Sequence, residues 1–225
     1  GNSHAQMYSP LLIKNLREFN LTGLLVPLNG CLPTTLVNRS KLCIKRAKQN
    51  LEVVLKNNEV KTVFIASTWY EDYYITNQGK RVKNSYLLLG FKDLINQLEN
   101  AGKNVALFSP IPIPSKNLAV DLPRLINFGW ITKSEALSYT WTPRSIYGKN
   151  FNEINSHFEQ ILGKNYIKVY NDLCDEQKCY YAKGSLLFFA DDNHISSLAL
   201  ENLKKTSDQV EKIFLKLKAN KNITN

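Results

Sequence analysis

The sequence predicts one α/β domain over residues 1–225, a three-layer α/β/α sandwich built on a mainly parallel sheet. The first observation is that short apolar runs, typical of buried strands, alternate with longer segments of helical apolar periodicity. Such alternation is typical of a parallel sheet with helices on both faces. The second is that short polar strings, one with a serine and one with an acid and a histidine, lie at the two ends of this pattern. Because ligands bind at the carboxyl ends of parallel strands, we expect the functional residues at that edge.

The first half of the chain predicts three strands separated by helices. Pro10 lies inside the first helical segment and predicts a kink or a restart there. In chain order, the expected elements are helix 5–19, buried strand 21–28, helix 37–56, strand 60–66, helix 91–99 and strand 104–108.

The second half begins with a stretch rich in proline and aromatic residues, which predicts an irregular cleft wall. In chain order, the expected elements are this wall over 109–147, helix 151–162, strands 166–170 and 185–189, helix 196–217 and a flexible tail from about 218. A sheet of this type normally has a strand directly before a nucleophile turn. The sequence opens at the turn, so we expect the first strand to be missing or trimmed from it.

Composition excludes few functions. The hydrophobic share of 44% and the charged share of 21% are ordinary for a globular protein. No apolar run of about 18 residues predicts a membrane span, and no signal peptide is recognised. The net charge of +10 suits nucleic acid, an anionic membrane surface or an acidic glycan. Because no nucleic-acid-binding signature accompanies this charge, we favour a solvated basic surface and expect no nucleic acid partner.

The four cysteines form two local pairs, Cys31 with Cys43 and Cys174 with Cys179. An even number in local pairs favours two disulfides that hold loops, because short loops cost the least entropy to close. Metal binding explains the cysteines less well, since no Cys-x-x-Cys occurs and no histidine lies near either pair. Free buried thiols remain an alternative. Two disulfides would place the protein in an oxidising compartment.

Two short strings supply the side chains of a nucleophilic site. Gly1-Asn2-Ser3-His4 opens the chain with a serine on a tight turn before a helical run. Asp191-Asp192-Asn193-His194 supplies an acid and an imidazole three positions apart. A serine, a histidine and an aspartate can together deprotonate an alcohol nucleophile, and such triads are defined by roles rather than by chain order. A capped surface loop, or an expression scar at the first residues, is the alternative explanation.

These strings resemble the blocks of a known superfamily. Gly1-Asn2-Ser3-His4-Ala5 is similar to the Gly-Asp-Ser-His-Ala nucleophile block of the SGNH hydrolases, and residues 191–196 resemble their C-terminal Asp-x-x-His-Leu-Ser block. The closest likeness is to the SGNH domain fused to acyltransferase-3 membrane proteins, which has similarly placed cysteine pairs. The segments 63–69 and 101–112 also resemble it. The resemblance runs to about residue 205 and implies an SGNH, flavodoxin-like fold.

The resemblance implies a role for each site residue. Ser3 would be the nucleophile, His194 the base, and Asp191, rather than Asp192, the group that holds the imidazole. The oxyanion hole would use the Ser3 backbone N–H, helped by the helix N-terminus, and Gly30, for which a plain turn glycine is an equal alternative. The substrate pocket would include Thr68 and Trp69, although a core position for Trp69 is equally compatible with the sequence. No metal site is expected.

Two departures bear on activity. The usual aspartate after the first glycine is Asn2, which supports the turn and can still accept a hydrogen bond. The superfamily's Gly-x-Asn-Asp block is absent, and residues 67–69 stand in its place. The oxyanion donor that the block supplies must therefore come from backbone N–H groups or another side chain.

The resemblance implies an O-acyltransferase that moves an acetyl group to hydroxyls of envelope glycans such as lipopolysaccharide through an acyl-enzyme. The domain would bind no cofactor, and a fused or adjacent acyltransferase-3 membrane domain would deliver an acyl group derived from acetyl-CoA. It would lie on the periplasmic side of the bacterial inner membrane. The alternatives are a free-standing carbohydrate or lipid acetyl esterase, and a catalytically disabled glycan-binding domain.

Overall fold

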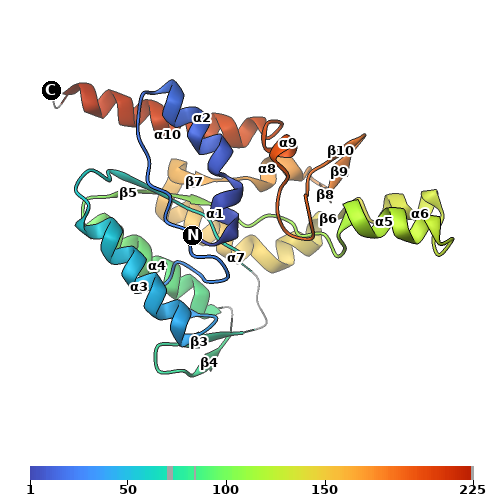
Figure 1. Cartoon of the computed structure of the whole chain (residues 1–225), viewed down its shortest axis with the longest axis horizontal. Helices are drawn as coiled ribbons and strands as arrows, with labels where there is room; N and C mark the ends of the chain where they lie inside the picture. Colours follow the sequence, from blue (N-terminus) through green and yellow to red (C-terminus); the bar gives the residue numbers. More distant parts are fainter. Residues whose placement is uncertain (70–72, 84, 224–225) are drawn as a thin grey trace.

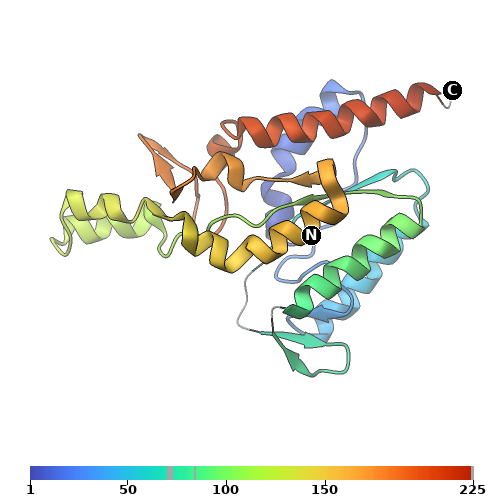
Figure 2. The same cartoon turned by 180° about the vertical axis from the view of Figure 1, so that it is seen from behind.

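A computed structural model describes residues 1–69, 73–83 and 85–223. Its main sheet consists of three parallel strands in the order β2 (Thr62–Ile65), β5 (Asn104–Phe108) and β7 (Tyr166–Ile167). Figures 1 and 2 show helices on both faces of this sheet. One face carries α1 (Ser3–Met7), α2 (Ser9–Glu18) and α10 (Lys204–Ile223), and the other carries α3 (Lys41–Lys56), α4 (Ser85–Asn100) and α7 (Arg144–Leu162). The predicted three-layer α/β/α fold is therefore confirmed.

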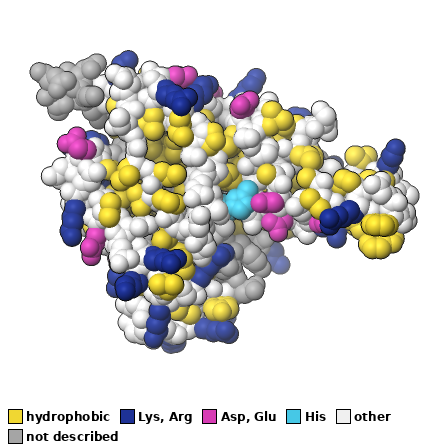
Figure 3. Space-filling model, in the orientation of Figure 1, with side chains coloured by type: hydrophobic (Ala, Val, Ile, Leu, Met, Phe, Trp, Pro, Cys, Tyr) yellow, Lys and Arg dark blue, Asp and Glu magenta, His cyan; other side chains and the backbone are white. Residues whose placement is uncertain are grey.

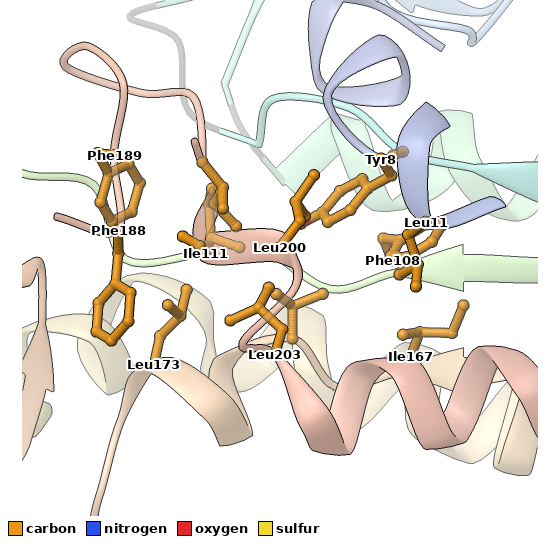
Figure 4. Close-up of a cluster of buried hydrophobic side chains, with 14 of the residues drawn as sticks. Tyr8, Leu11, Phe108, Ile111, Ile167, Leu173, Phe188, Phe189, Leu200 and Leu203 are labelled. Carbon is orange, nitrogen blue, oxygen red and sulfur yellow. The ribbon is translucent and has the colours of Figure 1, made fainter. Parts of the chain in front are cut away.

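Each face of the sheet has its own hydrophobic core. We call the core on the face that carries α1, α2 and α10 the upper core; the short helices α8 (Tyr170–Leu173) and α9 (Ser197–Leu200) also cover it. Within it, Tyr8 stacks on Phe108 of the central strand with ring centroids 4.1 Å apart, and Figure 4 shows these rings among aliphatic side chains. The lower core lies under α3, α4 and α7 and contains Trp69, Phe91 and Phe158. Burial on both faces explains why the strands read as continuous apolar runs.

Smaller elements surround the sheet. Three small antiparallel sheets accompany it. In the first, β3 (Tyr74–Thr76) pairs with both β1 (Val37–Asn38) and β4 (Arg81–Val82); in the others, β6 (Trp141–Pro143) pairs with β8 (Lys178–Tyr180), and β9 (Ala182–Lys183) with β10 (Leu186–Leu187). A 3₁₀ turn at Gly163–Asn165 leads into β7. The helices α5 (Leu118–Asn127) and α6 (Lys133–Ser138) form an arm that projects from the body in Figure 1. Within the described ranges, every helix is too short or too polar to span a bilayer.

The strand expected over residues 21–28 is wrong. This segment is extended but forms no ladder within the described part of the chain, and Leu24 and Leu25 are 57% and 52% exposed. The reason is that Gly1 lies between the segment and the sheet: its carbonyl accepts from Leu28 N–H at 2.7 Å, and its Cα faces the carbonyl of Ala66, just after β2. An apolar run without a strand beside it has no partner for its backbone groups.

The irregular wall expected over 109–147 is also wrong in part. It contains the arm helices α5 and α6, strand β6 and the start of α7. The side chain of Asn117 caps α5, and Thr132 with Glu135 forms a capping box at α6. These caps satisfy the first N–H groups of both helices, and α5 forms although Pro123 inside it removes one intrahelical hydrogen bond.

The helices expected near the two ends of the chain are each interrupted in the structure. The helix expected over 5–19 starts at Ser3 and is broken at Tyr8, with Pro10 in the first turn of α2, where a missing N–H costs nothing. The helix expected over 196–217 is two helices, α9 and α10. Helix α10 continues to Ile223, into the tail that was expected to be flexible from about 218.

Candidate active site

Ser3 is held at the start of α1 by its two neighbours. Asn2 caps the helix, since its side-chain oxygen accepts from His4 N–H at 3.0 Å. Gly1 approaches the main chain of Ala66 so closely that a Cβ there would lie 2.0 Å from the Ala66 oxygen. Only glycine fits this contact, which fixes the backbone of the nucleophile turn against the carboxyl end of β2. The Ser3 side chain is left half-buried and faces the site.

Asp191 and His194 come from the loop between β10 and α9. One carboxylate oxygen of Asp191 accepts from Asn193 N–H at 2.8 Å and from His194 N–H at 2.7 Å, which closes a tight turn. Ala190 N–H donates to the His194 carbonyl at 2.8 Å, and Ile195 N–H donates to the sulfur of Met7 in α1. The loop that carries the imidazole is therefore bonded both to itself and to the helix that carries Ser3.

The three predicted side chains meet in one series of hydrogen bonds, although 191 positions separate Ser3 from His194 in the chain. His194 Nε2 lies 2.8 Å from Ser3 Oγ, and His194 Nδ1 lies 2.7 Å from the second carboxylate oxygen of Asp191. This is the geometry in which an imidazole accepts a hydroxyl proton while a carboxylate fixes its tautomer. Asp192 is exposed and makes no hydrogen bond or ion pair within the described residues, which agrees with the predicted choice of Asp191.

The site is open to solvent. The side chains of His194 and Asp191 are 30% and 43% exposed, and Figure 3 shows a histidine beside acidic side chains on this face of the molecule. Desolvation raises the pKa of Asp191, but hydrogen bonds from Asn193 N–H, the His194 ring and His194 N–H outweigh it and lower the pKa below its usual value. Asp191 is therefore a carboxylate at neutral pH and can stabilise an imidazolium.

His4 lies behind the site, in contact with its imidazole. The two rings are 5.2 Å apart, and His4 is only 3% exposed. Burial above all, and then the charges of His194 and Arg39, lower the pKa of His4 to about 4 against the opposite effect of Asp191. Within the described residues His4 Nε2 has no hydrogen-bond partner, so this neutral, enclosed imidazole contributes packing behind the turn.

The residues predicted for the oxyanion hole and pocket lie at three different depths. Gly30 sits on an exposed turn with φ of 71°, two residues after Leu28, which bonds to Gly1. Thr68 is half-buried, and its hydroxyl oxygen accepts from the amide of Asn2 at 2.9 Å. Trp69 is 4% exposed and stacks on Phe91 at 4.4 Å, so its ring belongs to the lower core, the second of the two interpretations given above.

Both predicted disulfides are present, Cys31–Cys43 and Cys174–Cys179, and neither free thiols nor a group of metal-binding side chains occurs in the described residues. The first joins the residue after Gly30 to the first turn of α3. The second closes the loop between α8 and β8. The Gly30 turn is therefore fixed covalently, and the guanidinium of Arg39 donates to the Gly30 carbonyl at 3.4 Å.

Sequence reasoning missed the contact between Asn2 and Thr68. The asparagine oxygen receives the helix N–H while its amide reaches the loop after β2, so one side chain joins the nucleophile turn to the sheet edge. The two residues are 66 positions apart, and no local pattern announces their contact. The available signal was the departure itself: an amide in place of a carboxylate has a donor, and a donor needs an acceptor.

Comparisons with known proteins identify the fold and the family of the chain. A periplasmic domain of a lipopolysaccharide acetyltransferase from Salmonella ser. Paratyphi A has a similar structure, with a TM-score of 0.65 and 14% sequence identity over 93% of this chain and 81% of that one. Comparison with curated proteins finds no significant match. The model of the SGNH domain that is fused to AT3 domains matches residues 1–208. The chain therefore belongs to the family of SGNH domains fused to AT3 domains.

Proposed function

We propose that this domain transfers an acetyl group to hydroxyls of an envelope glycan such as lipopolysaccharide, through an acyl-enzyme on Ser3. The observation that carries the proposal is the series of hydrogen bonds from Ser3 Oγ through the His194 ring to the Asp191 carboxylate. The family and the fold of the Salmonella acetyltransferase domain support acyl transfer to a glycan. They do not distinguish transfer from hydrolysis, so the acceptor is part of the proposal.

In the first half-reaction, Ser3 Oγ attacks the carbonyl carbon of the acyl donor while His194 Nε2 accepts the hydroxyl proton. A C–O bond forms, and the carbonyl electron pair moves onto its oxygen. When this tetrahedral species collapses, the bond to the donor breaks and the imidazolium returns the proton to the leaving group. Asp191 holds Nδ1 protonated, so that Nε2 is free to accept, and stabilises the imidazolium between the two transfers.

In the second half-reaction, a sugar hydroxyl takes the place of the serine. His194 accepts the hydroxyl proton, the sugar oxygen attacks the acyl carbon, and the ester bond to Ser3 Oγ breaks as the serine regains its proton. The product is an acetylated sugar and free enzyme. Water completes the same sequence when no sugar is bound, and the partly exposed imidazole admits either acceptor.

The oxyanion needs donors, and two are assigned here. The Ser3 N–H lies in the first turn of α1, where no intrahelical acceptor exists. The hydroxyl of Thr68 is the second: the Asn2 amide donates to its oxygen, which leaves the hydroxyl hydrogen for another acceptor. Thr68 is half-buried, whereas its neighbours Ser67 and Trp69 are buried, so it is the residue of this segment that solvent and substrate can reach. Gly30 N–H is the third candidate donor.

The setting follows from the family. We propose that an acyltransferase-3 membrane domain delivers the acyl group, and that the SGNH domain works on the periplasmic side of the inner membrane. The two disulfides support an oxidising compartment, because such bonds are rare in the cytosol. The domain itself is proposed to need no cofactor.

The test is Ser3→Ala, with Ser134→Ala as the matched control. Ser134 is an exposed serine at the other end of the molecule, in α6. Aryl acetate hydrolysis and acetyl transfer to lipopolysaccharide should fall about 10³-fold or more in Ser3→Ala and stay at wild-type rates in Ser134→Ala. Wild-type rates in both assays with Ser3→Ala would refute Ser3 as the nucleophile, and no turnover by the wild-type chain in either assay would favour the glycan-binding module.

A free-standing esterase is the second candidate, and the open site favours it. The two functions differ in whether a sugar hydroxyl or water accepts the acetyl group from Ser3. If the wild-type chain hydrolyses aryl acetate but added glycan never diverts acetyl from water, the domain is an esterase. A disabled domain is disfavoured because Asn2 keeps both contacts of the turn, so the departure from aspartate leaves the triad geometry intact.

A further inference from the structure

The arm of α5 and α6 ends in a loop that exposes two aromatic rings. Trp130 is 72% exposed and Phe128 69%, the highest values among the large hydrophobic side chains of the described residues. Figure 1 shows the arm projecting from the body, and Figure 3 shows apolar side chains along it. We call residues 127–132, Asn-Phe-Gly-Trp-Ile-Thr, the aromatic tip.

The aromatic tip is rigid and its backbone is satisfied. Gly129, with φ of 69°, ends α5 in the left-handed conformation. Phe128, Gly129 and Trp130 N–H groups donate to carbonyls of α5 at 2.9, 3.0 and 2.9 Å, an arrangement of the Schellman type. The capping box of Thr132 and Glu135 then starts α6. With its donors used internally, this loop can leave water without losing backbone hydrogen bonds.

The two rings are not needed to hold the arm together. Leu125, Ile126 and Ile131 point inward and pack against the buried residues Leu118, Leu122 and Ala136. Phe128 and Trp130 instead contact each other, with ring centroids 5.4 Å apart and planes inclined by 30°. Their exposure therefore costs hydrophobic free energy that the fold does not recover, and an exposed apolar surface of this kind marks a binding site.

Charge identifies the occupant. Residues 125–132 carry no charge, and the basic residues Arg124 and Lys133 stand on either side of them. The two acidic residues of the arm are engaged in helix caps: Asp121 accepts from Asn117 N–H, and Glu135 accepts from Thr132. Apolar and aromatic residues between two cations match the interface of a bilayer, where rings lie at the headgroup level and cations meet anionic lipids.

We propose that the aromatic tip inserts into the headgroup region of a bilayer that contains anionic lipid. The aromatic tip has six residues, far fewer than the roughly 20 to 30 that each partner contributes to a stable protein interface. A sugar platform is disfavoured because the tip offers few free polar groups: the N–H groups of Phe128, Gly129 and Trp130 are already bonded, and the two acidic residues of the arm are engaged in helix caps. Insertion of two rings gives weak binding that would orient the domain rather than anchor it.

The fluorescence of Trp130 tests insertion directly. The chain has three tryptophans: Trp69 is 4% exposed, Trp141 is half-buried under the Lys178 ammonium, and Trp130 is 72% exposed, so lipid should change mainly the Trp130 emission. Vesicles of phosphatidylethanolamine and phosphatidylglycerol should shift the emission to shorter wavelength, and brominated lipid should quench it. Trp130→Phe should lose the shift yet still sediment with vesicles, because phenylalanine keeps an aromatic ring at the tip.

The double variant Phe128→Ser/Trp130→Ser should bind vesicles about tenfold more weakly or worse. Its matched control is Leu198→Ser, which removes a side chain that is 61% exposed elsewhere on the surface. Equal losses in both variants, or no vesicle binding by the wild-type chain, would overturn the proposal. A Trp130 shift on adding soluble envelope polysaccharide without lipid would replace it with a glycan platform. Ser3→Ala should bind vesicles like wild type, so this result is independent of the proposed catalysis.

Discussion

Asp191→Asn tests the proposed mechanism most sharply, because the structure predicts what survives and what is lost. The asparagine oxygen can still accept from Asn193 and His194 N–H, so the turn should keep its shape. The new amide would face His194 Nδ1 as a donor, where a carboxylate oxygen now lies at 2.7 Å. The imidazole would then carry its proton on Nε2, the nitrogen that must accept from Ser3.

The magnitude follows from the charge and the exposure. Opposite unit charges about 4 Å apart attract by about 4 kcal/mol at an effective dielectric constant of about 20. The Asp191 side chain is 43% exposed, so water screens part of this attraction, and we take roughly 2 to 4 kcal/mol. At about 1.4 kcal/mol per tenfold, the lost charge lowers kcat about 30- to 1000-fold. The wrong tautomer brings the expected loss to the upper end, about 10³-fold.

The assay is aryl acetate hydrolysis, with Asp192→Asn as the control that removes the adjacent, unpaired carboxylate. The control should stay within about twofold of wild type, because the Asp192 carboxylate is exposed and water and salt screen its charge. The reasoning fails if the two variants lose the same activity, or if Asp191→Asn keeps more than about a tenth of the wild-type kcat.

Three further predictions concern the surroundings of the triad. Asn2→Asp should keep activity within a few-fold, because a carboxylate oxygen can still accept from His4 N–H and cap the helix of Ser3. Asn2→Ala should lower the free energy of unfolding by about 1 kcal/mol through the lost cap; urea unfolding and hydrolysis rates check both. Because the pKa of buried His4 falls to about 4 from 6.5, its contribution to stability is complete above pH 6.5 and is lost as the pH falls toward 4. The free energy of unfolding of the wild type should therefore fall by up to about 3 kcal/mol over this range, and that of His4→Gln should not show this loss. Urea unfolding of both proteins at each pH measures the difference. Loss of the Cys174–Cys179 disulfide, with Cys31–Cys43 kept, should lower the free energy of unfolding by about 2 kcal/mol. An unchanged urea midpoint would contradict the loop-closure argument.

The sequence was most informative where a physical requirement is local. Alternating apolar segments identified the sheet and its layers, and the strand Asn104–Phe108 was predicted to the residue because burial on both faces leaves a continuous apolar run. Cysteine spacing identified both disulfides. The errors are of the opposite kind. Residues 21–28 have the composition of a strand but lack a pairing partner, and the two caps that start the arm helices were overlooked among prolines and aromatics.

The candidate site divides in the same way. Its three main side chains could be named from two short strings, because the residue types and the spacing of Asp191 and His194 follow from the chemistry. Their distances could not, since they depend on packing that joins the two ends of the chain. The Asn2–Thr68 contact and the buried His4 behind the triad also depend on long-range packing, and only the structure places them.

The partial exposure of His194 and Asp191 has a kinetic consequence for any acyl-enzyme formed there. With 30% and 43% of these side chains in contact with solvent, the ester on Ser3 would stand in water from the moment it forms. Water is always present, whereas a glycan hydroxyl must be brought to the site. The main product then depends on the relative rates of hydrolysis and of transfer to the sugar. A sugar held beside the ester has a large effective concentration, and a sugar free in solution does not. An open site of this kind would transfer acetyl only while its acceptor is held close to it, and would otherwise release the acetyl group by hydrolysis.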